Sequence, residues 1–342
     1  MVRFFTISTA SYFLGTVALL NSLWLTGHGN NLSVLDRGLS PRQRRLLSTR
    51  GTVVDLPSAA GPTPPVMLKA YPHVLGGDGT VAVIDSDIVV TDSLAPILER
   101  AAGGMIVSYI DPSGDRWFGE WQEIFGLTRR LRRQPYVGAG FVVLSTAHWP
   151  HLLRRWWELC CRIATDKRVA AGSPEDNPIY YGDQDALNAL LMSEVSAGAV
   201  LMLERPAVPI WQELRRVCVL DEHRLRCVHE GATPVMLHAA GSSKVWESRG
   251  WTHVDRRDAY ARLLVRCLTA PDLPLRLEPS EVPVWLRRGV RGAAVRVALS
   301  ALNRAGFTRI SPLRRALFAV LRIRKALRTL LVKFRRPVEA SP

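Results

Sequence analysis

The feature that most constrains the fold is the stretch VAVIDSDIVV, residues 81–90, in which an apolar run meets two aspartates. Val81 to Ile84 predict a buried strand, because the run is too short for a helix and follows the glycine-rich turn 76–79. Asp85 and Asp87 leave an extended chain on the same side, since side chains alternate along a strand. Two neighbouring carboxylates repel each other unless a cation, a proton or solvent separates them. The stretch therefore predicts either a polar turn at a strand end or a site for a divalent metal ion.

Strands and helices alternate in the N-terminal part of the chain. Apolar patterning predicts strands at 2–7, 32–35, 51–56 and 81–84, with a helix after each of the first three and Ser40-Pro41 beginning the second helix. This alternation is typical of an α/β domain with a mainly parallel sheet, in which ligands bind beyond the carboxyl ends of the strands. Residues 8–11 and 85–87 both follow such ends, so the two aspartates are expected at the mouth of a site.

The N-terminus is expected to be a strand, a polar turn and a helix rather than a secretory signal or a membrane span. Thr6, Ser8, Thr9 and Ser11 interrupt the apolar run, and no small-residue cleavage site follows Leu25. The five cysteines form no CxxC pair and are odd in number, which argues against a disulfide framework. We therefore expect a protein of the cytoplasm.

Positive charge is concentrated near the C-terminus. Residues 285–336 hold 15 of the 45 Lys and Arg and no Asp or Glu, which leaves 30 basic against 30 acidic residues elsewhere. Within this segment, residues 311–334 repeat apolar positions at helical spacing, from Leu313 to Phe334, with arginines beside or opposite them. The pattern predicts an amphipathic helix on an anionic membrane surface, peripheral on the inner face of the cell membrane. A helix packed on the body is the competing interpretation, and the neutral body argues against nucleic-acid binding.

Two further stretches of the chain place glycines or aspartates directly before an apolar run. In YVGAGFVVLS, residues 136–145, Gly138 and Gly140 predict either a bulge or a close approach of the backbone to a ligand. In YYGDQDALNALL, residues 180–191, Asp183 and Asp185 stand at the start of a helix, where Asp is ordinary. Neither stretch identifies a site on its own.

A third stretch, VMLHAAGSSKVW, ends the series at residues 235–246. His238 follows an apolar run, and a single histidine in such a place is more often structural than a ligand. Gly241 and Lys244, however, have the spacing at which a backbone amide and an ammonium group bind phosphate.

In this order the stretches resemble family 8 of the glycosyltransferases, which includes bacterial lipooligosaccharide galactosyltransferases and glycogenin. The family's Asp-x-Asp is matched at 85–87, its Asn-Ala-Gly-Val at 138–141, its Asp-Gln-Asp-x-Leu-Asn at 183–188 and its His-x-x-Gly-x-x-Lys-Pro-Trp at 238–246. The resemblance covers about residues 2–255 and implies the GT-A fold, an α/β fold with a mainly parallel twisted sheet. It implies a nucleotide-sugar-binding half at 1–112, an acceptor-binding and catalytic half at 113–270, and the basic tail at 285–336.

The resemblance also implies roles for single residues. Asp85, Asp87 and His238 would bind Mn²⁺ (or Mg²⁺), for which carboxylate and imidazole are suitable ligands. Gln184 would lie beside the anomeric carbon, and Asp183 would contact the transferred sugar or act as a transient nucleophile. The other residues implied in nucleotide-sugar binding are Ser8, Thr9, Tyr12, Lys69, Ser86, Asp111, Gly138, Ala139, Gly140, Gly241 and Lys244.

The chain departs from the family pattern at three places. The acidic residue that reads uracil is Ser8 or Thr9 here, so the preference for uracil is less certain from the pattern. The Asn before Ala139 is Gly138, which removes a contact to a sugar hydroxyl, and the Pro before Trp246 is Val245. None of these changes affects the three metal ligands.

The function expected from the sequence is a retaining, Mn²⁺-dependent transfer of a hexose, galactose or glucose, from a UDP-hexose to a glycan or lipid-linked acceptor. Arginines at 129–133 favour an anionic acceptor, unless they form a solvated loop. One alternative is a sugar nucleotidyltransferase, although the first turn lacks the glycine-rich, basic phosphate loop that such an enzyme needs. The other is a non-catalytic basic protein that binds membranes or nucleic acid.

Overall fold

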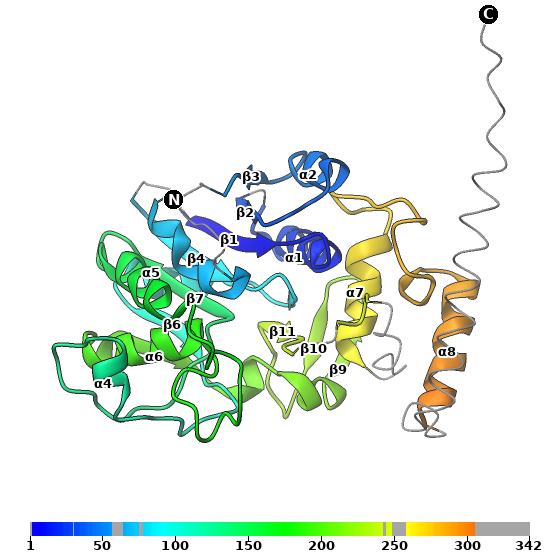
Figure 1. Cartoon of the computed structure of the whole chain (residues 1–342). Coiled ribbons are helices and arrows are strands. Elements are labelled where there is room, and N and C mark those ends of the chain that lie inside the picture. The colour runs from blue at the N-terminus through cyan, green and yellow to red at the C-terminus, as the bar shows by residue number, and fades with distance from the viewer. Residues whose placement is uncertain are drawn as a thin grey trace, which may run out of the picture.

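The structure, a computed structural model, describes residues 2–29, 31–56, 64–74, 78–241, 244–247 and 258–304. Its centre is a seven-stranded sheet in the order β3-β2-β1-β4-β7-β6-β8 (Figure 1). The strands are β1 (Val2–Ser8), β2 (Leu32–Asp36), β3 (Thr52–Val54), β4 (Thr80–Ile84), β6 (Ile106–Tyr109), β7 (Phe141–Ser145) and β8 (Val200–Leu203). Two small antiparallel pairs lie outside it, β5 (Ile88–Val90) with β11 (Met236–His238) and β9 (Cys218–Asp221) with β10 (Arg226–Val228).

The sheet is mainly parallel, which confirms the predicted fold class. β1 pairs in parallel with β2 and β4, β2 pairs in parallel with β3, and β6 pairs in parallel with β8. Only β7 runs antiparallel to its neighbours in this sheet, β4 and β6. Because β1 and β4 run in the same direction, the turns that follow Ser8 and Ile84 meet at one edge of the sheet.

Helices cover both faces of the sheet. The helices are α1 (Phe13–Leu25), α2 (Pro41–Leu47), α3 (Ala95–Ala102), α4 (Trp121–Ile124), α5 (Leu152–Ile163), α6 (Asp183–Ser193), α7 (Ala259–Thr269) and α8 (Val290–Arg304). Shorter 3₁₀ segments are Pro65–Val74, Ala197–Ala199, Arg205–Ala207, Trp211–Arg215 and Val284–Leu286. Figure 1 shows α1 beside α7 and, on the other side of the sheet, α5 near α6.

Alternation along the central strands assigns each side chain to one of two cores. Phe4 packs with α1 and α7, whereas Phe5 packs with α5 and α6. In β4, Ala82 and Ile84 face the first core, and Val81 and Val83 face the second. A strand buried on both faces therefore reads as the continuous apolar run that the sequence shows.

Local signals placed most elements correctly. Ser40 caps α2 by accepting from Gln43 N, and Gln43 Oε1 accepts from Ser40 N in return, with Pro41 at the first helical position. The strand predicted at 51–56 is limited to Thr52–Val54. The helix predicted before residue 81 is a 3₁₀ segment that contains Pro72, a residue without the N–H that a longer α-helix requires.

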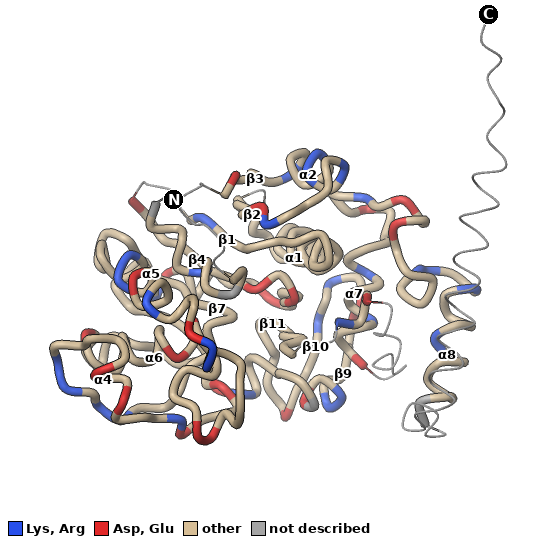
Figure 2. Tube along the Cα trace, viewed as in Figure 1, with Lys and Arg blue, Asp and Glu red and all other residues tan. Residues whose placement is uncertain are grey.

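The C-terminal segment begins on the body of the protein. Leu286 is fully buried, and Trp285 Nε1 donates to Val245 O at 2.9 Å. The sequence of helix α8 then contains arginines but no Lys, Asp or Glu (Figure 2). The amphipathic helix predicted at 311–334 lies outside the described residues. None of the helices in the described ranges is long and apolar enough to cross a membrane.

Candidate active site

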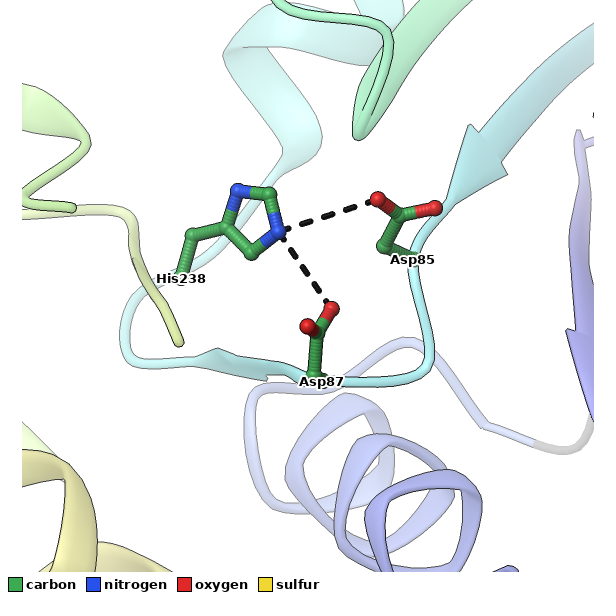
Figure 3. Close-up of side chains that lie close together, drawn as sticks. All are labelled: Asp85, Asp87 and His238. Atoms are coloured by element: carbon green, nitrogen blue, oxygen red, sulfur yellow. Dashed lines mark ion pairs between the residues drawn. The ribbon is translucent and has the colours of Figure 1, made fainter. Parts of the chain in front are cut away.

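Asp85, Asp87 and His238 meet at the carboxyl end of β4 (Figure 3). The aspartates occupy the turn between β4 and β5, and β11 brings His238 to them by pairing with β5, so that His238 lies opposite Ile88. His238 Nε2 lies 3.3 Å from Asp87 Oδ1 and 3.7 Å from Asp85 Oδ2. One ligand atom from each residue lies within 4.8 Å of the others. Two carboxylates and one imidazole at this separation fit a divalent ion such as Mn²⁺.

Each carboxylate of this group is also paired with a lysine. Lys244 Nζ contacts Asp87 Oδ2 and donates to Ala239 O, and Lys244 is 2 % exposed. Lys69 Nζ lies 3.1 Å from both Asp85 and Asp183. Burial alone would raise the pKa of Asp87, but Lys244 and His238 lower it below its usual range. The expectation of two mutually repelling, solvent-facing carboxylates is therefore wrong, because lysines distant in sequence compensate their charge.

Lys244 and His238 contact different oxygens of Asp87. Asp87 directs Oδ2 at Lys244 and Oδ1 at His238, so a cation beside the imidazole would not displace the ammonium group. Asp85 is the more accessible of the two, with 26 % of its side chain exposed. The arrangement can therefore hold a metal ion on the side that faces the solvent and a substrate.

A cavity of about 640 Å³ opens beside this group. It is lined by these residues implied from the sequence: Thr9, Tyr12, Lys69, Asp85, Ser86, Asp87, Asp111, Gly140, Asp183, Gln184, His238, Gly241 and Lys244. Ser8, Gly138 and Ala139 do not line it. Ser8 is buried, with its hydroxyl accepting from Thr16 Oγ1 at 2.7 Å, so a base in the cavity would meet Thr9 rather than Ser8.

The glycine-rich stretch before β7 allows the backbone to approach the Asp85–Asp87–His238 group. Asp85 N donates to Gly140 O at 2.7 Å. A Cβ on Gly140 would lie 2.6 Å from His238 Cε1 and 2.9 Å from Asp85 Oδ2, which no larger residue can accommodate. Ala139 acts through its backbone, because its N–H donates to Gln184 Oε1 at 3.1 Å.

The start of α6 supplies the two remaining polar groups of the cavity. Gln184 Oε1 is occupied by Ala139 N, so the amide nitrogen is the part of this side chain left for a ligand. Asp183 is 4 % exposed, and its Oδ2 lies near Lys69 without a hydrogen-bond partner among the described residues. Burial, only partly offset by Lys69, raises the pKa of Asp183 to about 6.

We expect the raised pKa of Asp183 to make stability depend on pH. The unfolded carboxyl titrates near 3.9, so between about pH 4 and pH 6 the folded state binds more protons, and stability falls as pH rises. The quantity to follow is the free energy of unfolding of the metal-free wild-type protein minus that of Asp183→Asn. This difference should decrease by roughly 2–3 kcal/mol from pH 4 to pH 7. Denaturant titration at several pH values measures this difference, and a difference independent of pH would contradict it.

Sequence reasoning did not find several residues of the site. Tyr109, Tyr181 and Trp211 line the cavity, and Trp211 has a backbone φ of +54°. Only Tyr109 had a usable signal, since it precedes Asp111 by two positions at the end of a strand. A buried ion pair between Arg116 and Asp185, at 2.6 Å, also fixes the loops around α6, because Arg116 donates to Asn177 O as well.

The arginines at 129–133 do not face the cavity. Arg129 and Arg132 donate to the carbonyl oxygens of Glu194 and Leu191 near the C-terminus of α6. Arg133 stacks over Trp117 at 4.3 Å. Among the described residues that line the cavity, none comes from this run.

Comparison with solved structures identifies the fold. An active-site mutant of LgtC covers 83 % of this chain and 99 % of its own, with a TM-score of 0.54 and 17 % identity. The chain has the GT-A fold. Galactosyltransferase LgtC with donor and acceptor sugar analogues matches this GT-A domain at a TM-score of 0.51 and 17 % identity, over 80 % of this chain and 98 % of its own.

A third structure extends the comparison to a larger protein. The bifunctional glycosyltransferase WbbM matches this GT-A domain with a TM-score of 0.51 and 15 % identity, over 80 % of this chain and 50 % of its own. In sequence, no protein-family model and no curated protein matches the chain. The likeness is therefore one of fold.

Proposed function

We propose that the protein is a retaining glycosyltransferase that moves a hexose from a UDP-hexose to a hydroxyl of a glycan or lipid-linked acceptor. The observation that carries this proposal is that the Asp85–Asp87–His238 group lines one cavity together with Gln184 and Asp183. Its support from the comparisons is that the GT-A neighbours are glycosyltransferases, one of them bound to donor and acceptor sugar analogues. A bound Mn²⁺ would neutralise negative charge on the departing diphosphate.

The side chains of the cavity have complementary tasks in this proposal. Lys244, with two of its three N–H donors used by Asp87 and Ala239, keeps one for the diphosphate, and Gly241 adds a backbone amide. Thr9, Tyr12 and Ser86 receive the nucleoside. Lys69, Asp111 and Asp183 contact the hydroxyls of the sugar.

The reaction we propose proceeds on one face of the sugar. Gln184 is a poor nucleophile, so the acceptor oxygen attacks from the side on which the diphosphate leaves, and a phosphate oxygen takes its proton. The Gln184 amide stabilises the oxocarbenium-like transition state. Asp183 remains the alternative nucleophile, since its carboxyl lies in the same wall of the cavity.

Binding of UDP is expected to require a divalent ion. Without it, the carboxylates already neutralise Lys69 and Lys244, so the site has little net positive charge with which to bind a diphosphate. Calorimetric titration of UDP should give binding with Mn²⁺ and at least tenfold weaker binding with EDTA. Equal affinity under both conditions would show that the Asp85–Asp87–His238 group does not take part.

We also propose that residues 285–336 hold the enzyme peripherally at an anionic membrane surface on the cytoplasmic side. Val290 on α8 is 88 % exposed, and its neighbour Arg291 is exposed too. An apolar and a basic side chain at the start of α8 are therefore both accessible to a membrane surface. Each Lys or Arg near such a surface contributes about 1 kcal/mol.

Removal of residues 305–342 tests the membrane proposal. A cut after Val284 would delete buried Leu286 and damage the body, so the chain should end at Arg304. The shortened enzyme, which keeps Val290 and Arg291, is expected to sediment much less with anionic liposomes than the full chain and to keep its turnover of donor, whereas neutral liposomes should bind neither form. Equal binding of the shortened and full chains to anionic liposomes would exclude the removed residues as the anchor.

A further inference from the structure

Tyr109 lines the cavity and was not assigned a role by the motifs of the sequence. It ends β6, is 2 % exposed, and its ring lies against the backbone of Gly138. A Cβ on Gly138 would lie 2.2 Å from Cε2 and Cζ of Tyr109. Gly138 N donates to Tyr109 O at 2.9 Å, which keeps the two backbones at this distance. A side chain at position 138 and the ring of Tyr109 in its present place therefore exclude each other.

The hydroxyl of Tyr109 reaches the metal-binding histidine. Tyr109 Oη lies 3.1 Å from His238 Nδ1, the ring nitrogen that faces away from Asp85 and Asp87. The two rings meet at 77° with their centroids 6.0 Å apart. His238 is 4 % exposed, so water does not readily replace this partner.

We propose that Tyr109 is a positioning residue for His238 and also fills the volume that a side chain at position 138 would take. The positioning role rests on the proposed metal-dependent function. For His238 Nε2 to bind a cation, its proton must move to Nδ1, and a buried Nδ1–H needs an acceptor. A hydroxyl serves both tautomers: it donates to a bare Nδ1 when Nε2–H faces Asp87, and it accepts from Nδ1–H when Nε2 faces a cation. Such partners of a metal-binding histidine fix its orientation.

Tyr109→Phe tests the positioning role, because it keeps the ring over Gly138 and removes only the hydroxyl. Mn²⁺ affinity, measured without donor, is expected to fall roughly 10- to 100-fold. In the full-length protein with Mg²⁺, the ¹⁵N signals of His238 should show the Nδ1–H tautomer, and this state should be depleted in the variant. Tyr260→Phe is the matched control, since the Tyr260 hydroxyl is buried without a hydrogen-bond partner in the described part of the chain.

The outcomes separate this inference from the proposed function. If the wild-type protein binds no Mn²⁺, the metal centre and the positioning role are both overturned. If the wild-type protein and Tyr109→Phe bind Mn²⁺ equally and His238 keeps its tautomer, only the positioning role is overturned.

A pair of variants tests the space-filling role without any metal. Gly138→Asn should lower the melting temperature or prevent folding, because its side chain meets the Tyr109 ring. Gly138→Asn combined with Tyr109→Ala should recover a folded protein with a higher melting temperature than Gly138→Asn alone. The space-filling role would be overturned if Gly138→Asn melted at the same temperature as the wild type, or if the double variant melted no higher than Gly138→Asn.

Discussion

Asp87→Ala is expected to abolish hexose transfer and to destabilise the fold at the same time. The side chain of Asp87 is 7 % exposed and pairs with Lys244, so its removal leaves a buried ammonium group with one carbonyl partner. Breaking a buried pair from one side costs about 3–5 kcal/mol. Donor turnover and urea unfolding of the same preparations measure both effects.

Two further variants separate the loss of activity from the loss of stability. Asp87→Ala combined with Lys244→Met removes the unpaired charge, so it should regain most of the stability and stay inactive. Asp85→Ala should be equally inactive but less destabilised, because Lys69 keeps its contact with Asp183. Substantial turnover in either single Asp variant would contradict the assignment of the metal ligands.

Gln184→Ala is expected to lower turnover by a factor on the order of 10², because the loss of one donor aimed at a transition state has about this effect. Donor affinity should change by much less, since the interaction develops mainly in the transition state. Single-turnover kinetics and direct measurement of donor binding distinguish the two quantities.

Gln184→Glu controls for the structural part of this change. It keeps an oxygen that can accept from Ala139 N, so the turn before β7 should be undisturbed. Asp183→Asn should instead weaken both donor binding and turnover, because Asp183 is paired with Lys69 in the cavity wall. A Gln184→Ala enzyme with a raised KM and an unchanged kcat would assign Gln184 to binding and exclude the proposed mechanism.

The elements around the site were predictable because their signals are local. The apolar run 81–84, the helix start at Ser40-Pro41 and the helix that begins at Asp183 depend on neighbours within a few residues. His238 could be grouped with the aspartates only through the resemblance in motif order. Its position follows from the pairing of β11 with β5, segments far apart in sequence.

The electrostatic character of the site could not be predicted in the same way. Lys244 meets Asp87 across 157 positions of sequence, and no spacing rule indicates that contact. If the contact with Lys244 is not known, the sequence predicts two exposed carboxylates at positions 85 and 87. The contact of Tyr109 with Gly138 also joins residues that are distant in sequence, so the motif alone does not indicate that a ring occupies the space of a side chain at position 138.

Release of UDP from a panel of UDP-hexoses tests the central claim most directly. The full-length protein should hydrolyse at least one of them slowly with Mn²⁺, because water can replace a missing acceptor. Release should stop with EDTA and in the Asp87→Ala, Lys244→Met double variant, which is expected to remain folded. Absence of Mn²⁺-dependent UDP release from every member of the panel, or release that persists in the folded double variant, would contradict the account.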